Sequence, residues 1–296
     1  MDTTIRPVAQ PATSVGWRTN RRVHYALKMT VVYLCLAAGG FFVSVPFAWM
    51  LSTSLKTLGQ TFVFPPIWVP VPLQWVNYVK VFEVLPFMRY FINTVYVSGL
   101  SVAGILFASS LAGFSFARLR WRGSTVLFVV VLSTMMLPPQ VTMIPKFILF
   151  RILEWIDTYK PLIVPSLFGT GFQIFLFRQF FSTIPREIDE AARMDGCGFV
   201  GTYARIILPL SGPAIITGFL FAFRYNWNEF LEPLIYLNTH SKFTLALGLR
   251  LFQGEFTTNW PLLMAASTIA MLPVLLTFYF GQRYFIQGVV ISGVKG

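Results

Sequence analysis

The segment from Arg186 to Pro213 reads REIDEAARMDGCGFVGTYARIILPLSGP and brings charged residues into an otherwise hydrophobic chain. Its spacing runs Glu190-Ala191-Ala192, three residues, Gly196, nine residues, Ile206, one residue, then Leu208-Pro209. Hydrophobic stretches lie on both sides of it. Because charges are costly within lipid, we expect this segment to lie outside the bilayer, where another protein can reach it.

The segment contains the start and stop signals of a short helix. Ser182 or Thr183 can cap its N-terminus, and Pro185 suits the first turn. Acidic residues follow at once, where they stabilise the positive end of a helix. Gly196 marks the expected end, because helices often stop at a left-handed residue. The spacing predicts a helix of about ten residues.

One face of this predicted helix carries small side chains. Residues three or four apart share a face, which places Ile188, Ala191, Ala192 and Asp195 together. The two alanines would let another backbone approach closely. An ordinary amphipathic helix on the membrane surface would explain the mixed polarity. It would not explain the spacing of the glutamate, the glycine and the later Leu-Pro pair.

The pattern resembles the coupling loop of permease subunits of ATP-binding-cassette importers, in the maltose and glycerol-phosphate permease family. Asp195-Gly196 and the C-terminal Val294-Lys295-Gly296 are similar to the carbohydrate branch, although Cys197 stands where alanine is most common there. The resemblance covers nearly the whole chain from residue 30 onward. In the family this loop seats its helix in a cleft of the ATP-hydrolysing subunit. The resemblance therefore implies an ATPase-coupling loop at residues 182–212. It also implies that contact with the ATPase involves Glu190, Ala191, Ala192, Asp195 and Gly196.

The composition predicts an integral membrane protein. Apolar residues make up 55% of the chain, charged residues 11%, and the mean hydropathy is +0.66. Soluble domains carry about 25% charged residues. We expect an all-α bundle in lipid, with a polar tail at residues 1–28, disordered to about residue 20, and a membrane domain at 29–296. Uncharged stretches predict spans at residues 29–51, 91–117, 124–145, 161–177 and 256–282.

One further span, the fifth in chain order, is harder to place. Ten apolar residues from Pro213 to Ala222 reach about 15 Å as a helix, too little to cross a bilayer. The span either stops halfway or continues past Arg224 and Glu229 toward Tyr236. We expect continuation, which gives six spans; the resemblance implies the architecture of a type I importer permease.

The distribution of positive charge places both termini in the cytoplasm. With six spans and an internal N-terminus, cytoplasmic segments carry 14 Lys and Arg, and the remaining segments carry nine. The short turn at residues 118–122, Arg-Leu-Arg-Trp-Arg, is the clearest marker, since short loops show this bias best. The net charge of +12 then reflects segments that face anionic lipid, and no nucleic-acid partner is expected.

The sequence contains no catalytic motif. It lacks the Gly-x-x-x-x-Gly-Lys-[Ser/Thr] phosphate loop, His-Glu-x-x-His and Gly-x-Ser-x-Gly. His24 and His240 would lie on opposite sides of the membrane, and Cys35 and Cys197 would not meet. We expect a non-catalytic subunit without cofactor or metal; the resemblance implies that partner subunits hold ATP and Mg²⁺.

A polar run near membrane depth is the candidate solute path. Charged and polar groups at this depth usually face a cavity or a partner. Amides, carboxylates and aromatic rings suit sugars, which favours Asn226, Trp227, Asn228 and Glu229, with Gln140 and Gln173 as lesser candidates. The run could instead bind a partner subunit or lie just outside the bilayer.

An outer segment gives a second candidate contact. Gln253-Gly254-Glu255 suits a flexible loop and is similar to the family's loop that reaches into the docked binding protein. A simple connector explains these residues nearly as well.

The expected function is that of a permease subunit of a binding-protein-dependent, ATP-driven importer in a bacterial or archaeal inner membrane. It would form half of the path for a sugar or oligosaccharide; glycerol-phosphate or another polar solute is the alternative. The resemblance implies a second permease, two ATP-binding subunits and an external solute-binding protein as partners. A stand-alone secondary transporter would show paired broken spans in inverted repeats, which we do not find. A membrane enzyme would need catalytic motifs that are absent.

Overall fold

The computed structural model describes residues 16–254 and 258–290, which are mostly helical. The first half contains α1 (Gly16–Ser54), η1 (Leu58–Gln60), α2 (Val76–Val84), α3 (Phe87–Arg118), α4 (Ser124–Thr134) and α5 (Pro139–Ile152). Next come α6 (Lys160–Ile163), η2 (Val164–Phe168), α7 (Gly171–Thr183), α8 (Glu187–Met194), α9 (Phe199–Thr202), η3 (Tyr203–Ile207) and α10 (Leu208–Leu210). The last are α11 (Gly212–Asn228), α12 (Leu231–Tyr236), η4 (His240–Lys242), α13 (Leu245–Arg250) and α14 (Trp260–Val290).

The chain forms two units, which are described separately. The first ends at Ser52 and the second begins at Thr53. The first consists mainly of α1, which is longer than its predicted span because the helix already begins at Gly16. The expected tail is therefore helical from that residue on, and residues 1–15 lie outside the described residues. His24–Ser54 is long and apolar enough to cross a membrane.

The second unit holds the other candidate spans. Phe87–Arg118, Lys160–Thr183 and Trp260–Arg283 each have the length and hydropathy to cross a bilayer. Two bent helix pairs, α4 with α5 and α9–α10 with α11, raise the total in the described residues to as many as six. The number of spans agrees with the sequence-based expectation when each bent pair counts as one span.

The third predicted span, residues 124–145, is not a straight helix. α4 and α5 meet at an angle of 96°. Pro138 is extended at the junction, and Pro139 begins α5. Proline lacks an N–H donor and disfavours a helical conformation in the residue before it, so the proline pair ends one helix and starts another.

The fifth predicted span does not continue as one helix to Tyr236. α11 ends at Asn228, and the separate helix α12 begins at Leu231. Glu229 Oε1 accepts hydrogen bonds from the backbone N–H groups of Leu231 and Glu232 at 2.9 and 3.1 Å. The carboxylate therefore caps a new helix, because it satisfies donors that would otherwise lack partners.

The fourth span is divided by a glycine. Gly169 lies between η2 and α7 with φ of +77°, and a Cβ atom added to it would lie 2.7 Å from Ser109 Oγ on α3. No larger residue fits this conformation and this approach. Glycine thus allows the chain to change direction directly against α3.

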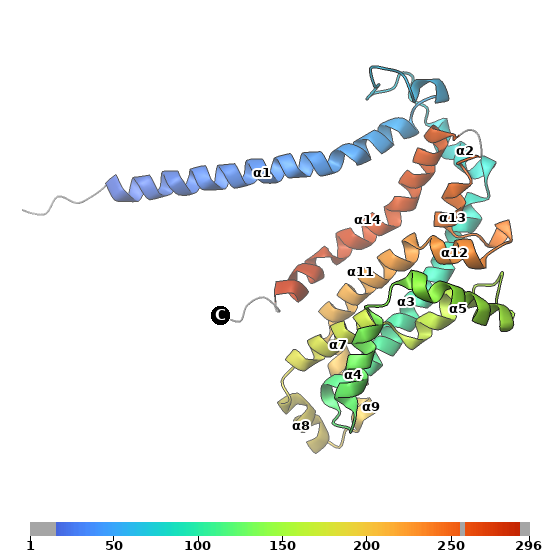
Figure 1. Cartoon of the computed structure of the whole chain (residues 1–296). Helices are drawn as coiled ribbons and strands as arrows, with labels where there is room; N and C mark the ends of the chain where they lie inside the picture. Colours follow the sequence, from blue (N-terminus) through green and yellow to red (C-terminus); the bar gives the residue numbers. More distant parts are fainter. Residues whose placement is uncertain (1–15, 255–257, 291–296) are drawn as a thin grey trace, which may run out of the picture. The chain divides into compact units, whose positions relative to one another are not determined.

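α3 is the central helix of the second unit. It packs against α7 and α11, and α11 packs against α14 (Figure 1). A Cβ on Gly113 of α3 would lie 2.6 Å from Phe177 Cβ of α7. Small residues at such contacts let membrane helices approach closely, which favours their association in lipid.

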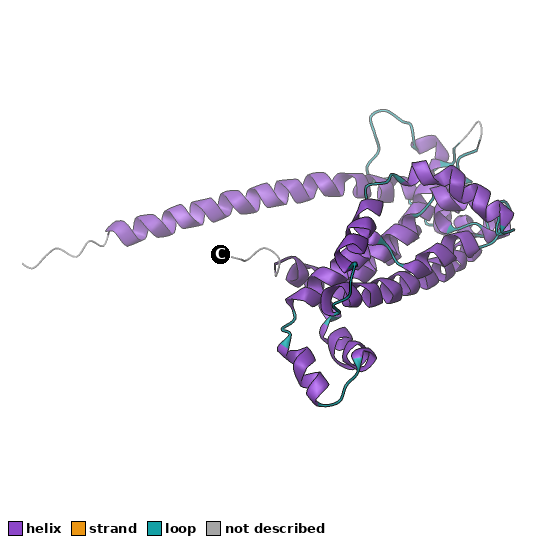
Figure 2. Cartoon of the chain, turned by 60° about the horizontal axis from the view of Figure 1, so that its bottom comes forward, coloured by secondary structure: helices purple, strands orange, loops and turns teal. Residues whose placement is uncertain are grey.

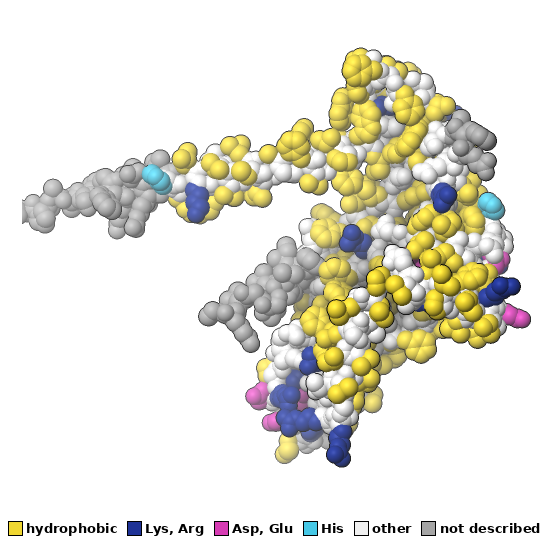
Figure 3. Space-filling view, viewed as in Figure 1, with side chains coloured by type: hydrophobic (Ala, Val, Ile, Leu, Met, Phe, Trp, Pro, Cys, Tyr) yellow, Lys and Arg dark blue, Asp and Glu magenta, His cyan; other side chains and the backbone are white. Residues whose placement is uncertain are grey.

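The short helices after α7 lie at one end of this unit. Figures 1 and 2 show α8 and α9 beyond the ends of the long helices, away from α12 and α13. Charged side chains gather at the α8 end, while hydrophobic side chains dominate the neighbouring surface (Figure 3). This arrangement separates a polar terminal element from an apolar body.

Candidate functional site

The helix α8 forms where the sequence predicts it, but its N-terminus differs. Arg186 holds the N-cap position, and Glu187 begins the helix. Ser182 and Thr183, the predicted caps, still belong to the end of α7, where their hydroxyls donate to the carbonyls of Arg178 and Phe180. Because these bonds keep both hydroxyls within α7, neither hydroxyl caps the N-terminus of α8.

The C-terminal end of α8 agrees with the sequence-based expectation. Gly196 has φ of +79°, the left-handed conformation that favours glycine. Its N–H donates to Arg193 O at 3.0 Å, and the N–H of Cys197 donates to Ala192 O at 2.8 Å. These bonds satisfy carbonyls that the helix leaves open.

The two alanines of α8 face different surroundings, contrary to the expectation that they share one contact face. Ala192 is buried against its own chain with 4% exposure. Ala191 and Glu190 are exposed, as are Asp195 and Met194. The outward side of α8 is therefore available for another protein, whereas Ala192 allows α8 to lie close to the rest of the second unit.

A buried ion pair anchors α8 to the end of α3. Arg118 Nη1 lies 3.3 Å from Asp189 Oδ2, and the two side chains are 3% and 16% exposed. Arg118 Nη2 also donates to Ile184 O at 2.8 Å. Beyond α8, the hydroxyls of Ser110 and Tyr203 share a buried hydrogen bond of 2.7 Å. α3 therefore holds the segment on both sides of α8.

Exposed apolar side chains follow the helix. Met194 is 88% exposed, Val200 80% and Phe199 57%. The guanidinium of Arg193 lies 5.3 Å from the centre of the Phe199 ring. Contiguous exposed apolar groups rimmed by polar ones are typical of sites that contact another protein or a membrane.

A cavity of about 640 Å³ with a mixed apolar and polar wall lies beside α11, and four of the predicted path residues line it. Gln173 of α7 lines this cavity together with Asn226, Asn228 and Glu229. Gln173 Nε2 donates to Gly218 O at 2.9 Å, which fixes the amide in place. Gln140 lies exposed on α5 and is not among the lining residues.

Trp227 does not reach this cavity. Its side chain is 4% exposed, and its Nε1 donates to Ala270 O of α14 at 3.0 Å. The rings of Phe91 and Phe223 lie 5.6 and 5.2 Å from its ring. The face expected to stack on a sugar is thus covered, and Trp227 joins α11 to its neighbours instead.

The cavity also contains residues that the sequence-based list left out. Arg224 and Tyr225 line it from α11, and Thr170 lines it from the residue before α7. The charge of Arg224 inside an apolar segment was an available signal. Thr170 had no such signal, because its place depends on how α7 packs.

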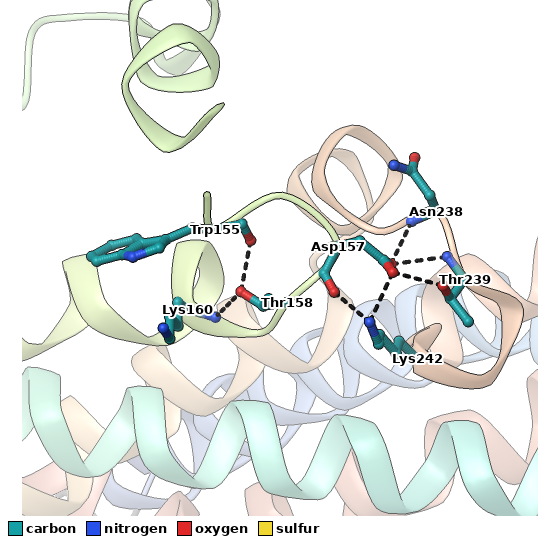
Figure 4. A network of polar contacts seen from close by, with 7 residues as sticks. All are labelled: Trp155, Asp157, Thr158, Lys160, Asn238, Thr239 and Lys242. Carbon is teal, nitrogen blue, oxygen red and sulfur yellow. Dashed lines mark hydrogen bonds and ion pairs between the residues drawn. The ribbon is translucent and has the colours of Figure 1, made fainter. Parts of the chain in front are cut away.

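Two loops far apart in the sequence are joined by a polar clamp at Asp157 (Figure 4). Its carboxylate accepts from the backbone N–H groups of Asn238 and Thr239 at 3.0 and 2.9 Å, from Thr239 Oγ1 at 2.6 Å and from Lys242 Nζ at 2.8 Å. The Lys242 ammonium group, with the Thr239 donors, holds the pKa of Asp157 well below its usual range. The clamp fixes the loop before α6 to the segment before α13.

The predicted binding-protein contact lies just after α13. Gln253 forms an isolated antiparallel bridge with Thr258, and Gly254 is exposed. Glu255 lies outside the described residues.

The chain is similar to known proteins over most of its length. Residues 101–291 match the family described as binding-protein-dependent transport system inner membrane component. An arabinooligosaccharides transport system permease protein of Halalkalibacterium halodurans is 34% identical, over 83% of this chain and 86% of that protein. A trehalose/maltose transport system permease protein of Thermococcus litoralis is 31% identical, over 85% of this chain and 91% of that protein.

A solved structure shows the same fold. One chain of a bacterial transporter involved in the import of the acidic polysaccharide alginate matches with a TM-score of 0.74 and 22% identity, covering 93% of this chain and 100% of that one. The helical membrane architecture and the family match over residues 101–291 lead to one conclusion. The protein is a multi-pass membrane permease that belongs to the family of binding-protein-dependent transport system inner membrane components.

Proposed function

We propose that this protein is the permease subunit of an ATP-driven importer that takes up a sugar or oligosaccharide. The observation that carries the proposal is α8, which is anchored to α3 on one side by the Arg118–Asp189 pair and exposed on the other. The relatives named for arabinooligosaccharides and for trehalose and maltose support the solute class.

The outward side of α8 is the proposed contact with an ATP-binding subunit. Glu190, Ala191 and Asp195 contact that subunit directly, since they are exposed. Ala192 and Gly196 act by shape, because one lies against the chain itself and the other ends the helix. Two such subunits hold ATP and Mg²⁺ and perform the hydrolysis, while this chain is not catalytic.

The cavity beside α11 forms this chain's half of the solute path. Asn226, Asn228, Glu229 and Gln173 supply amide and carboxylate groups that can replace the water bound to sugar hydroxyls. A second permease lines the other half. Gln140 and Trp227 have no place in this path.

The α8 end of the second unit faces the cytoplasm in this proposal. The arginine-rich turn at residues 118–122 lies near α8 and supports this orientation, since positive residues favour the cytoplasmic side. Both termini then lie in the cytoplasm of a bacterium or archaeon. The α12–α13 end faces the external solute-binding protein, with Gln253 and Gly254 near the docking surface.

Two proline substitutions test the coupling role of α8. Gly196→Pro removes the left-handed residue and the N–H that bonds Arg193 O, so α8 loses its C-terminal end. Gly198→Pro is the matched control, because Gly198 already has φ of −76°, which proline adopts. We expect Gly196→Pro to lose uptake and co-purification with the ATP-binding subunit, and Gly198→Pro to keep both. Equal behaviour of the two variants in membranes would contradict the proposal.

A further inference from the structure

A cavity rich in arginine lies at the α8 end of the second unit. It measures about 540 Å³ and is lined mainly by α8 and by the turn that follows α3. The charged side chains of its wall, among the described residues, are Arg118, Arg120, Arg186, Arg193, Asp189 and Glu190. We call this cavity the arginine pocket. Its wall carries more positive charges than negative ones, so it attracts anions.

Two of these arginines keep their charge available for a ligand. Arg118 is already engaged, because its guanidinium pairs with Asp189 and donates to Ile184 O. Arg120 and Arg193 are exposed, and no carboxylate in the described part of the chain forms an ion pair with either. One belongs to the turn after α3 and the other to α8. An anion bound by both would therefore join these two elements.

An aromatic residue accompanies each of the two arginines. Trp121 follows Arg120 in the chain and also lines the pocket, and its ring lies 5.7 Å from the ring of Phe116 on α3. Phe199 lines the pocket as well, and the guanidinium of Arg193 lies 5.3 Å from the centre of its ring. Tryptophan is enriched at the level of lipid headgroups, because its ring has an apolar body and a polar N–H. The pocket therefore has the composition of a membrane surface site.

An exposed apolar surface follows the pocket along α4. This helix begins at Ser124, just after the turn that holds Trp121, and it belongs to a candidate span. Val126 is 70% exposed, Val129 58% and Val130 51%. Figure 3 shows the Lys and Arg side chains of the α8 end beside a largely hydrophobic surface. Acyl chains can cover such a surface.

The combination of groups matches an anionic phospholipid. Guanidinium groups bind phosphate oxygens through paired, charge-assisted hydrogen bonds, which suits arginine to a phosphodiester. Basic pockets at the cytoplasmic ends of membrane helices bind lipid headgroups in this way. A free phosphate or an acidic peptide would reach the two arginines, but neither brings acyl chains to cover α4.

We infer that the arginine pocket binds the headgroup of one anionic phospholipid of the cytoplasmic leaflet, with Arg120 and Arg193 as its phosphate ligands. The inference goes beyond the proposed function and takes from it only the orientation of the chain. Ala191 and Asp195, which we assign to the ATP-binding subunit, do not line the pocket. Glu190 does line it, so the lipid and that subunit meet at this residue. The lipid links α8 to the turn after α3 and steadies its position.

Native mass spectrometry of the complete importer tests the binding. The importer in a neutral detergent is titrated with dioleoylphosphatidylglycerol or with dioleoylphosphatidylcholine. The pocket variant Arg120→Gln/Arg193→Gln is compared with Arg122→Gln/Arg205→Gln, which removes the same charge from exposed arginines that do not line the pocket. We expect the pocket variant to lose one tightly bound phosphatidylglycerol for each copy of this chain, and the control variant to keep it. Binding of phosphatidylcholine should be the same in both.

Three other results of this titration would each overturn the inference. An equal loss in both variants would mean that surface charge in general attracts the lipid. No loss in either variant would mean that another part of the importer, such as the ATP-binding subunit, covers the pocket. Displacement of the bound phosphatidylglycerol by inorganic phosphate would indicate a site for a free anion.

Fluorescence quenching provides a second measurement with both arginines intact. The emission of Trp121 is the difference between the unmodified importer and Trp121→Phe, in which a ring still packs on Phe116. The importer is placed in phosphatidylcholine nanodiscs that contain a small fraction of either phosphatidylglycerol or phosphatidylcholine with brominated acyl chains. We expect brominated phosphatidylglycerol to quench the Trp121 emission several-fold more strongly than the same fraction of brominated phosphatidylcholine. Equal quenching by the two lipids would rule out a site for the anionic one.

Discussion

Replacing Asp189 by asparagine tests whether the buried ion pair anchors α8. The substitution keeps the shape of the side chain and removes its charge. Arg118 then remains in place with 3% exposure, and its guanidinium keeps the bond to Ile184 O but loses its counter-ion. Breaking a buried pair on one side costs about 3–5 kcal/mol, because a charge stays buried without compensation.

The magnitude follows from the geometry. Asparagine can still accept a hydrogen bond from Arg118, so the lower end of that range, about 3 kcal/mol, applies. At about 1.4 kcal/mol for each factor of ten, the ratio of anchored to released α8 falls roughly a hundredfold. Amide hydrogen exchange in α8 should accelerate by a similar factor, while exchange in α14 stays unchanged.

Hydrogen exchange and uptake together provide the assay. Arg186→Gln is the control, because Arg186 is exposed near the same pair. The double variant Arg118→Met/Asp189→Leu should regain slow exchange, since removing both charges leaves none buried. The reasoning is refuted if Asp189→Asn exchanges and transports like the unmodified protein.

Three further predictions concern other parts of the chain. Trp227→Phe should lower the thermal midpoint through loss of one buried hydrogen bond, worth about 1 kcal/mol, while solute selectivity stays the same; altered selectivity would contradict its burial. Because the folded pKa of Asp157 is lowered, its contribution to stability is complete above the unfolded value of about 3.9 and is lost as pH falls through the folded value. The difference in the free energy of unfolding between the unmodified protein and Asp157→Asn should be the same at pH 7 and at pH 5. Lys242→Met should lower the free energy of unfolding in the same way. A difference that vanishes by pH 5 would be decisive against the clamp. A cysteine at Arg193 should label only from the cytoplasm and one at Val71 only from outside, and the reverse would invert the orientation.

Local signals in the sequence were sufficient for the position of α8 and for its end. Gly196 follows a run of helix-forming residues, and the left-handed conformation at that point is a local property. The uncharged stretches likewise locate the long helices, because crossing a bilayer requires length and apolarity only. Both features depend on residues close together in the chain.

Tertiary contacts decided the features that the sequence did not predict. Ser182 and Thr183 had the chemistry of helix caps, but α7 continues through them and takes up their hydroxyls. Trp227 had the chemistry of a sugar platform, but α14 covers it. No local pattern states that Asp189 meets Arg118, since that pairing exists only once α3 and α8 lie together.

α3 is one unbroken helix from Phe87 to Arg118, so it can act as a lever between the contacts at its two ends. Near its N-terminal end Asn93 Nδ2 donates to the carbonyls of Ser241 and Phe243, and Thr94 Oγ1 accepts from the N–H of Leu245. From there to Arg118 the helix rises about 38 Å, so a tilt of about five degrees at one end displaces the other by roughly 3 Å. Because α3 joins the two contacts as one helix without a loop between them, we expect a displacement of α8 to reach the segment before α13.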